Sequence, residues 1–442
     1  MSLYRANQSS ISLRGGKPNK TNNPVQPAQW VRPSDWLALT IPGAAEQKFV
    51  GLIAVFDQAS NYVALRCQVS TGTYTVDWGD GTAPQTYTTN TTAEYNYTYS
   101  NLSSSTDCSR GYRQAIVTVT PTTAGATFSE VGLNYRHSAR SSTSTVVTWL
   151  DVAVSAPNAT TLRLGGVNSA GTQTCLLTFL EQATIVSHNT TTMANMFNGC
   201  RELQSVPLFN TAAVTTMTSM FNDCTSLQSV PLFNTAAVTA MNSMFNTCSS
   251  LQSVPLFNTA AVTTMASMFS SCSSLRTIPE LTLSAISSVN NNNMTLSGSV
   301  TLGKAKLTGM RWTQSFNGCN MSAAELNEMY TALDKLNPNV TNVTGNGTTV
   351  TYTVDDITAF VAGRTVTITG VSPVAYNLTN ATVATVNTTN GTFTVTNAAT
   401  GTYVSGGVAA IQNNRTITVT GNPGTATDDE TIATNKGWTV TT

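Results

Sequence analysis

A 24-residue repeat constrains this chain more than any other feature of its sequence. The phrase Met-Phe-x-x-Cys begins at Met196 and returns every 24 residues until Met268, and the text LQSVPLFNTAAVT recurs at the same step. A fixed period of this length is typical of a solenoid, in which each unit buries its apolar residues by stacking on its neighbours. The sequence therefore predicts a stack of coils, with its regular part at residues 196–275.

Each repeat has two halves with different apolar spacing. Leu203, Val206 and Leu208 have the spacing of a leucine-rich-repeat strand. In residues 214–221 the apolar positions fall at i, i+3, i+6 and i+7, which predicts about two turns of helix. Because strands stack about 4.8 Å apart and packed helices about 8–10 Å apart, we expect the stack to curve with its strands on the inner face.

A row of polar residues should lie on that strand face. It consists of Gln204, Gln228 and Gln252 beside Ser205, Ser229 and Ser253. One interpretation is a shallow polar surface that binds a glycan or a protein. The other is a self-paired amide ladder that only keeps the face soluble, and the sequence leaves both open.

The repeats resemble the BspA-like leucine-rich repeats of bacterial surface proteins, which carry a similar Met-Phe-x-x-Cys-x-x-Leu phrase. The resemblance implies an α/β leucine-rich-repeat solenoid that serves adhesion or display. It implies no catalysis and identifies no ligand.

Composition excludes several classes of partner. The 442 residues suffice for about three domains, and charged residues make up 10%, with 21 basic against 21 acidic. Such a chain has no global field that would attract nucleic acid or an anionic membrane. No apolar run reaches the length of a membrane span, and the N-terminus shows no secretory signal. We therefore expect synthesis in the cytoplasm and exit inside a particle.

The cysteines predict a buried ladder rather than bridges. There are eight, and Cys200, Cys224, Cys248 and Cys272 keep the repeat step. Parallel Cβ vectors in a ladder fit disulfide geometry poorly, and no CxxC or Cys-His pairing suggests zinc. We expect free thiols, no metal and no cofactor.

Residues 1–44 predict an extended N-terminal arm. Basic residues such as Arg5, Arg14 and Lys17 precede the first acid, Asp35. The arm either docks on an acidic surface or is a frayed terminus. The phrase from Trp30 to Leu37 suggests an anchor and resembles an N-terminal phrase of tailed-phage structural proteins. That resemblance implies contact with other virion proteins.

Residues 45–155 predict a β-sandwich. The segment Tyr74–Thr82 alternates up to an Asp-Gly turn, and its Trp-Gly-Asp-Gly phrase resembles PKD-like domains, which are binding or spacer modules. Asp77 and Asp80 could be catalytic carboxylates or calcium ligands. We favour turn residues, because Asp accepts local backbone hydrogen bonds.

Residues 156–338 predict the solenoid, which ends in a helix from Ala323 to Leu336 that Ser322 and Glu325 cap. Residues 339–413 alternate Thr with apolar residues and predict a second β-sandwich, which resembles Ig-like modules of phage virion proteins. Residues 414–442 predict a terminal coil and cap, so that the Ig-like module is inserted in a loop of that coil.

Catalytic motifs are absent from the sequence. His137 and His188 stand apart from any nucleophile phrase, and we interpret the acid clusters Asp355-Asp356 and Asp428-Asp429-Glu430 as turns or helix starts. We therefore do not expect an enzyme, although a glycan-degrading activity is a third and weaker alternative. No catalytic, cofactor-binding or metal-binding residue is predicted.

The resemblances imply a structural and adhesion protein of a tailed-phage virion, as a tail fibre, a baseplate appendage or a head decoration. Several copies on the particle surface would bind a glycan or protein of the host. The alternative is a BspA-like adhesin of a bacterial cell surface.

Overall fold

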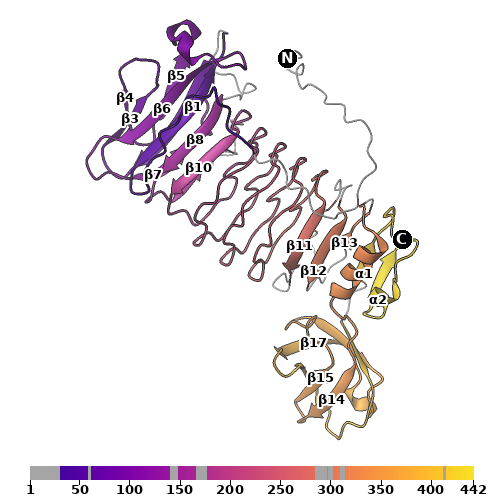
Figure 1. The fold of residues 1–442 in the computed structure, drawn as a ribbon. Helices are drawn as coiled ribbons and strands as arrows, with labels where there is room; N and C mark the ends of the chain where they lie inside the picture. Colours follow the sequence, from indigo (N-terminus) through magenta and orange to yellow (C-terminus); the bar gives the residue numbers. More distant parts are fainter. Residues whose placement is uncertain are drawn as a thin grey trace.

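The computed structural model describes residues 30–57, 61–139, 148–165, 177–283, 296, 302–308, 314–317, 319–411 and 415–442. Within them helix is limited to α1 (Ala323–Ala332), α2 (Thr431–Thr434) and the short 3-10 turns η1 (Tyr99–Asn101), η2 (Ser104–Thr106) and η3 (Val374–Tyr376). The chain is β-rich, with several sheets and more than one domain (Figure 1). None of the described helices has the length and apolar character needed to cross a membrane.

The N-terminal unit consists of two sheets. The first has the order β10 (Gln182–Ser187), β8 (Trp149–Ser155), β1 (Lys48–Val55), β6 (Arg113–Pro121), β3 (Thr73–Asp77) and β4 (Gln85–Thr88). The second has the order β5 (Thr92–Tyr97), β2 (Asn61–Val69), β7 (Phe128–Gly132) and β9 (Thr161–Arg163). Phe49 and Val117 of the first sheet share a core with Leu65 and Val131 of the second.

The sheets continue beyond residue 155 into the stack. β10 pairs in parallel with β8, and Gln182 in turn forms a parallel bridge with Ser205 of the first regular coil. The same buried cluster extends from Phe49 to Trp438. The N-terminal unit and the coils therefore share one continuous core.

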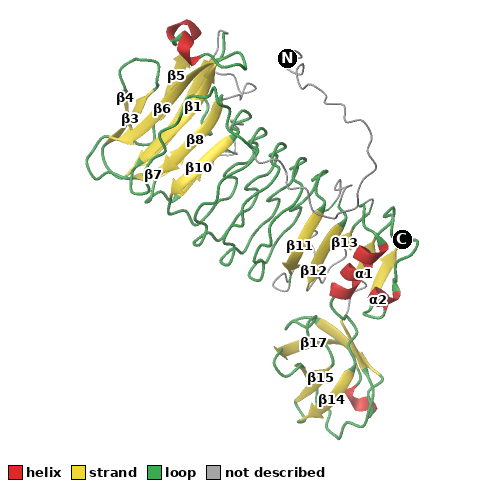
Figure 2. Ribbon diagram, viewed as in Figure 1, coloured by secondary structure: helices red, strands yellow, loops and turns green. Residues whose placement is uncertain are grey.

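The repeats form a stack of coils that backbone hydrogen bonds join (Figure 2). On one side the amide of Gln228 donates to the carbonyl of Gln204 at 3.2 Å, and that of Gln252 donates to Gln228 at 3.3 Å. Inside, Met217, Phe221 and their counterparts are fully buried, as the apolar spacing predicts. Phe221 lies between two equivalent rings, with centroids 5.4 Å from Phe197 and 5.7 Å from Phe245.

The predicted helix in each repeat is wrong. Residues 217–224 form a ribbon of overlapping turns, because Ser219 and Asp223 have φ of 54° and 59°, outside the helical region. The amides of Met220, Asn222 and Cys224 donate to carbonyls three residues back. The amides between them donate to the next coil, for example Phe221 to Met244 at 2.9 Å. The ribbon thus uses its backbone donors in two directions, which a helix cannot do.

The predicted curvature fails for the same reason. Both sides of each coil carry direct backbone hydrogen bonds to the neighbouring coil, so that neither side needs the wider spacing of packed helices. Figure 1 shows the coils as a nearly straight row.

Two small parallel sheets and a helix close the far end of the stack. β11 (Thr277–Thr282) pairs with β12 (Lys304–Thr308), and β20 (Arg415–Thr418) lies between β13 (Gln314–Ser315) and β21 (Trp438–Thr441). α1 starts with the predicted capping box of Ser322 and Glu325 but ends at Ala332 rather than Leu336.

The second β unit, residues 340–411, has one six-stranded sheet and a core largely of its own. Its strands have the order β14 (Val340–Gly345), β15 (Thr349–Val354), β18 (Thr392–Thr396), β17 (Leu378–Asn387), β16 (Thr365–Thr369) and β19 (Val408–Ile411). Tyr352, Ile368 and Phe393 belong to a buried cluster separate from that of the stack. The chain leaves the stack before β14 and returns to it at β20, which pairs with β13.

Candidate functional site

A groove of about 880 Å³ runs along the side of the coils that carries Gln204 and Gln228, which we call the strand side. Three rows of equivalent residues line it, one member per coil, and one short segment closes its end. These are Gln204 and Gln228; Gln182, Ser205, Ser229 and Ser253; Pro207, Pro231 and Pro255; and Trp30, Val31 and Arg32. The predicted polar row thus lies in a concave surface. Gln252 belongs to the same row but does not line the groove.

The local sequence explains which side chains face the groove. Leu203 and Val206 are buried, and Gln204 and Ser205 between them are half-buried. The strand prediction placed Leu208 inside, which is wrong, because Leu208 is 65% exposed and Phe209 is buried instead. Proline interrupts the strand alternation here; in the next coil the amide of Phe233 donates to the carbonyl of Pro231 in a tight turn.

The exposed leucine recurs in each coil and forms an apolar ridge. Leu208, Leu232 and Leu256 are 65%, 58% and 60% exposed. Val31, at the closed end of the groove, is also strongly exposed. A repeated exposed leucine is an unusual use of an apolar side chain and favours an interaction surface.

Two rows of side-chain amides behave differently. Across the described residues, Gln204, Gln228 and Gln252 make no side-chain hydrogen bond to one another. The amide ladder is formed instead by the asparagines of the turn ribbon: Asn222 Nδ2 donates to Asn198 Oδ1 at 3.0 Å, and Asn246 Nδ2 donates to Asn222 Oδ1 at 2.8 Å. The sequence analysis missed this ladder, although the repeated Met-Phe-Asn phrase contains it.

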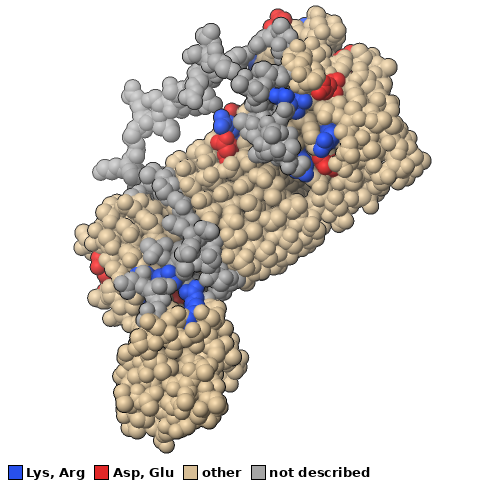
Figure 3. Space-filling model, turned by 180° about the vertical axis from the view of Figure 1, so that it is seen from behind, with Lys and Arg blue, Asp and Glu red and all other residues tan. Residues whose placement is uncertain are grey.

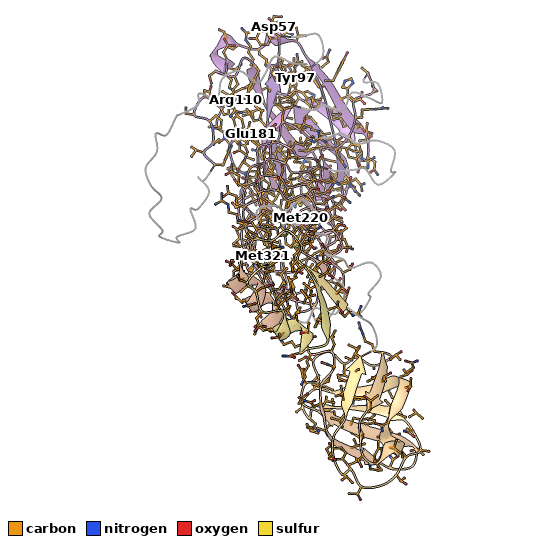
Figure 4. All side chains as sticks on the ribbon, turned by 90° about the vertical axis from the view of Figure 1, so that its right-hand side faces the viewer. Asp57, Tyr97, Arg110, Glu181, Met220 and Met321 are labelled. Atoms are coloured by element: carbon orange, nitrogen blue, oxygen red, sulfur yellow. The ribbon has the colours of Figure 1, made fainter. Side chains whose placement is uncertain are left out.

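The end wall of the groove is held rigidly on the N-terminal unit. Arg32 Nε lies 2.7 Å from Asp151 Oδ2, and Trp36 Nε1 donates to the hydroxyl of Tyr112 at 2.9 Å. The guanidinium of Arg110 lies 5.5 Å from the ring of Trp36 and pairs with Glu181. Arg110 and Glu181 are labelled near each other in Figure 4. The tryptophan-rich anchor therefore packs on its own chain. Residues 1–29 of the predicted arm lie outside the described residues.

Charge is scarce along the groove. Arg32 is the one ionisable residue among those that line it in the described structure, and its charge is paired with Asp151. Burial raises the pKa of Asp151, and the hydrogen bond and charge of Arg32 oppose that shift. Figure 3 shows that, on the face it presents, Lys, Arg, Asp and Glu side chains gather in a few clusters and most of the visible surface of the coils is uncharged.

The other candidate residues have structural partners. Asp77 Oδ1 accepts from the amide of Gly79 at 2.9 Å and Asp80 Oδ1 from that of Thr82 at 3.1 Å, as the turn interpretation predicts. Asp355 pairs with Lys335 at 2.7 Å, and Asp428 accepts from the hydroxyl of Tyr330 at 2.8 Å.

The histidines lie apart from each other. His137 packs on Tyr62 with ring centroids 4.6 Å apart, and the hydroxyl of Thr190 lies 2.9 Å from His188 Nδ1. Burial lowers the pKa of His188. In the part of the chain that the structure describes, no group of three or more His, Cys, Asp or Glu side chains could hold a metal ion.

The thiols form the predicted buried ladder. Cys224 Sγ donates to the carbonyl of Phe197 and Cys248 Sγ to that of Phe221, both at 3.1 Å. The seven described cysteines are free and buried. Burial raises the pKa of Cys224 and Cys248 well above the ordinary thiol value, so these side chains act as packing groups and not as nucleophiles.

A family model and a solved structure are similar to parts of this chain. The family model described as "Mycoplasma protein of unknown function, DUF285" matches residues 185–302. A leucine-rich repeat protein of T. pallidum is similar over 43% of this chain and 82% of its own length, at 16% identity and a TM-score of 0.24. No curated protein matches the chain.

Proposed function

We propose that this chain is a non-enzymatic structural and adhesion protein whose groove binds a ligand on a host surface. The observation that carries the proposal is the groove itself, with its glutamine row free of mutual hydrogen bonds and its ridge of exposed leucines. Glutamine and leucine side chains that recur in successive coils, and that neither pair with one another nor pack in the core, are suited to attachment. Many copies on one particle would raise avidity without any new contact.

The virion location rests on the resemblances. We infer a PKD-like sandwich at residues 45–155, a leucine-rich-repeat solenoid, and an Ig-like sandwich at 339–413 inserted in its last coil. The two sheets of the N-terminal unit, the six-stranded sheet of the second β unit and the pairing of β13 with β20 support this arrangement. A tail fibre, a baseplate appendage and a head decoration fit it equally.

Residues 1–29 are the part of the arm available for docking on other virion proteins. Trp30 to Leu37 are engaged by the N-terminal unit, since Arg32 and Trp36 contact Asp151 and Tyr112. A variant that lacks residues 1–29 and keeps Trp30 onward therefore tests docking without removing the end wall of the groove.

The experiment mixes full-length protein or this variant with particles stripped of the protein. Bound copies are counted by mass and located by electron microscopy. We expect only the full-length protein to rebind. Rebinding of both forms would assign docking to another segment, and rebinding of neither would remove the virion location.

A bacterial cell-surface adhesin is the second candidate, which the BspA-like repeats favour. The two locations are separated by purifying the protein from its source. Copurification with cell envelopes and not with particles would select the adhesin.

A further inference from the structure

We propose that the groove binds an uncharged, extended polysaccharide that runs along the stack, one sugar unit per coil. This inference rests on the proposed function, because it names the ligand class of the same groove.

The charge of the lining indicates an uncharged ligand. The groove offers amides, hydroxyls, proline rings and leucines, and its one cation, Arg32, is already paired with Asp151. An acidic polymer or a basic peptide would lose hydration on entry and find no free counter-charge. A neutral polyol loses less hydration free energy on entry, and the amides and hydroxyls of the groove replace its hydrogen bonds to water.

The repetition of the lining indicates a polymer. The coils that begin at Leu203 and Leu227 each present one glutamine amide and one serine hydroxyl in equivalent positions, and the next coil adds Ser253. On this side of the stack the ring centroids of Phe209 and Phe233 are 5.0 Å apart, which reports the step between coils. That step is similar to the length that one hexose adds to an extended, equatorially linked chain.

One buried acceptor lacks a donor at the closed end of the groove. Gln182 Oε1 is buried and has no hydrogen-bond partner among the described residues. An unpaired buried acceptor is destabilising, and a hydroxyl that reached this oxygen would satisfy it. The parallel bridge between Gln182 and Ser205 places this glutamine at the head of the serine row that lines the groove.

The apolar parts of the groove match the other face of a sugar ring. Pro207, Pro231 and Pro255 line it, the ridge of Leu208, Leu232 and Leu256 flanks it, and Trp30 closes it. A pyranose ring presents C–H groups on its faces and hydroxyls at its rim. Apolar contact on one side and amide or hydroxyl contact on the other fit that division.

An extended peptide fits less well. Peptides that lie along sheets bind through free backbone groups of an edge strand. Here the backbone amides of Gln204, Gln228 and Gln252 are already used between coils. The groove therefore offers side-chain contacts only.

The test uses calorimetry with the full-length protein and four hexasaccharides. Cellohexaose and β-1,4-mannohexaose are uncharged and extended, maltohexaose is uncharged and curved, and hexagalacturonate is charged. We expect an extended uncharged hexamer to bind best, and its trimer to bind more weakly. The double variant Gln204→Ala/Gln228→Ala should weaken binding about tenfold, as loss of two hydrogen bonds implies.

The matched control is Thr215→Ala/Thr239→Ala, which removes two hydroxyls outside the groove that donate to carbonyls of the preceding coil at 3.1 Å and 3.2 Å. It should bind as the unaltered protein does. No binding of either extended uncharged hexamer at millimolar concentration, preference for hexagalacturonate, or equal loss in the control would overturn the proposal.

A parallel assay separates this inference from the proposed function. Labelled protein is applied to host cells treated with periodate, which cleaves sugar diols, or with protease. Loss of adhesion only after periodate supports the polysaccharide. Loss of adhesion only after protease treatment is compatible with the adhesive function but contradicts a polysaccharide ligand. Hexamer binding without any adhesion to cells would keep the ligand class and overturn the adhesive function.

Discussion

The asparagine row and the glutamine row occupy the same coils but have opposite roles. Asn198, Asn222 and Asn246 hydrogen-bond to one another along the turn ribbon. The glutamines of the other side line a groove and make no such ladder within the described residues. The difference teaches that one repeat can use the same group, a side-chain carboxamide, for stacking on one side of the coils and for recognition on the other.

The apolar residues show the same division. Phe221 is buried between two parallel rings, whereas Leu232, also repeated in every coil, is 58% exposed. Repetition alone therefore does not identify the residues that hold the stack together. Burial and hydrogen bonding do.

The largest effect should come from the apolar pair. Phe221→Ala should reduce the free energy of unfolding by about 3–5 kcal/mol, because it empties a site between stacked rings. Leu232→Ala, on the exposed ridge, should change it by no more than about 0.5 kcal/mol. Urea unfolding followed by tryptophan fluorescence measures both. Similar losses of unfolding free energy in the two variants would contradict the division between a stacking side and a recognition side.

The amide pair should give a smaller contrast. Asn222→Ala removes one donor and one acceptor from the ladder and should cost about 1–3 kcal/mol. Gln228→Ala should cost no more than about 0.5 kcal/mol. The same unfolding experiment applies, and a large loss in Gln228→Ala would show that the glutamine row is structural.

The buried thiols predict that the stack loses folding stability at alkaline pH. Burial raises the pKa of Cys272 from 9.0 to about 12. The folded state therefore holds this proton more tightly, so the stabilisation is complete below pH 9 and is lost as the pH rises towards 12. Between pH 8 and pH 10 the Cys272→Ala variant should lose about 1 kcal/mol less stability than the unaltered chain.

The control for this experiment is Ser253→Ala, which lies on the groove side and carries no titrating group. Its pH profile should follow that of the unaltered chain. Identical profiles for all three proteins would contradict a buried, protonated thiol.

The smallest effect should follow removal of the second β unit. Its core is separate from that of the stack except at Ala359, which belongs to the buried cluster of the stack, and Ile411, which packs against both clusters. Its described contacts at the junction include the part-exposed pair Lys335–Asp355. Deleting residues 340–411 and joining the ends should change the stability of the coils by about 1 kcal/mol or less. Trp438 fluorescence reports on the terminal coil. Unfolding of the repeats would show that residues 339–413 are not an insertion.

Much of the fold could be predicted because local patterns determine it. The period, the burial of Met217 and Phe221, the turn at Asp80 and the capping box at Ser322 all follow from short-range chemistry. The helix was wrong because overlapping turns bury residues at nearly the same spacing. Gly199, which stands where the next repeat has Asp223, was the available signal, since both have positive φ.

The groove could be predicted only in part. The glutamine and serine rows follow from the repeat, but its end wall comes from Trp30 and its unpaired acceptor from Gln182. These residues lie outside the period, and long-range packing places them. The exposed Leu208 was missed because proline reverses the strand alternation at that point.

Hydrogen exchange of the side-chain amides tests the division between the two rows most directly. Protein labelled with ¹⁵N in asparagine and glutamine side chains would resolve both rows by NMR. We predict slow exchange at Asn222 and Asn246 and fast exchange at Gln204 and Gln228. Slow exchange at the glutamines in the absence of ligand would mean that they form a ladder of their own. That result would contradict the proposal that the groove is a binding site.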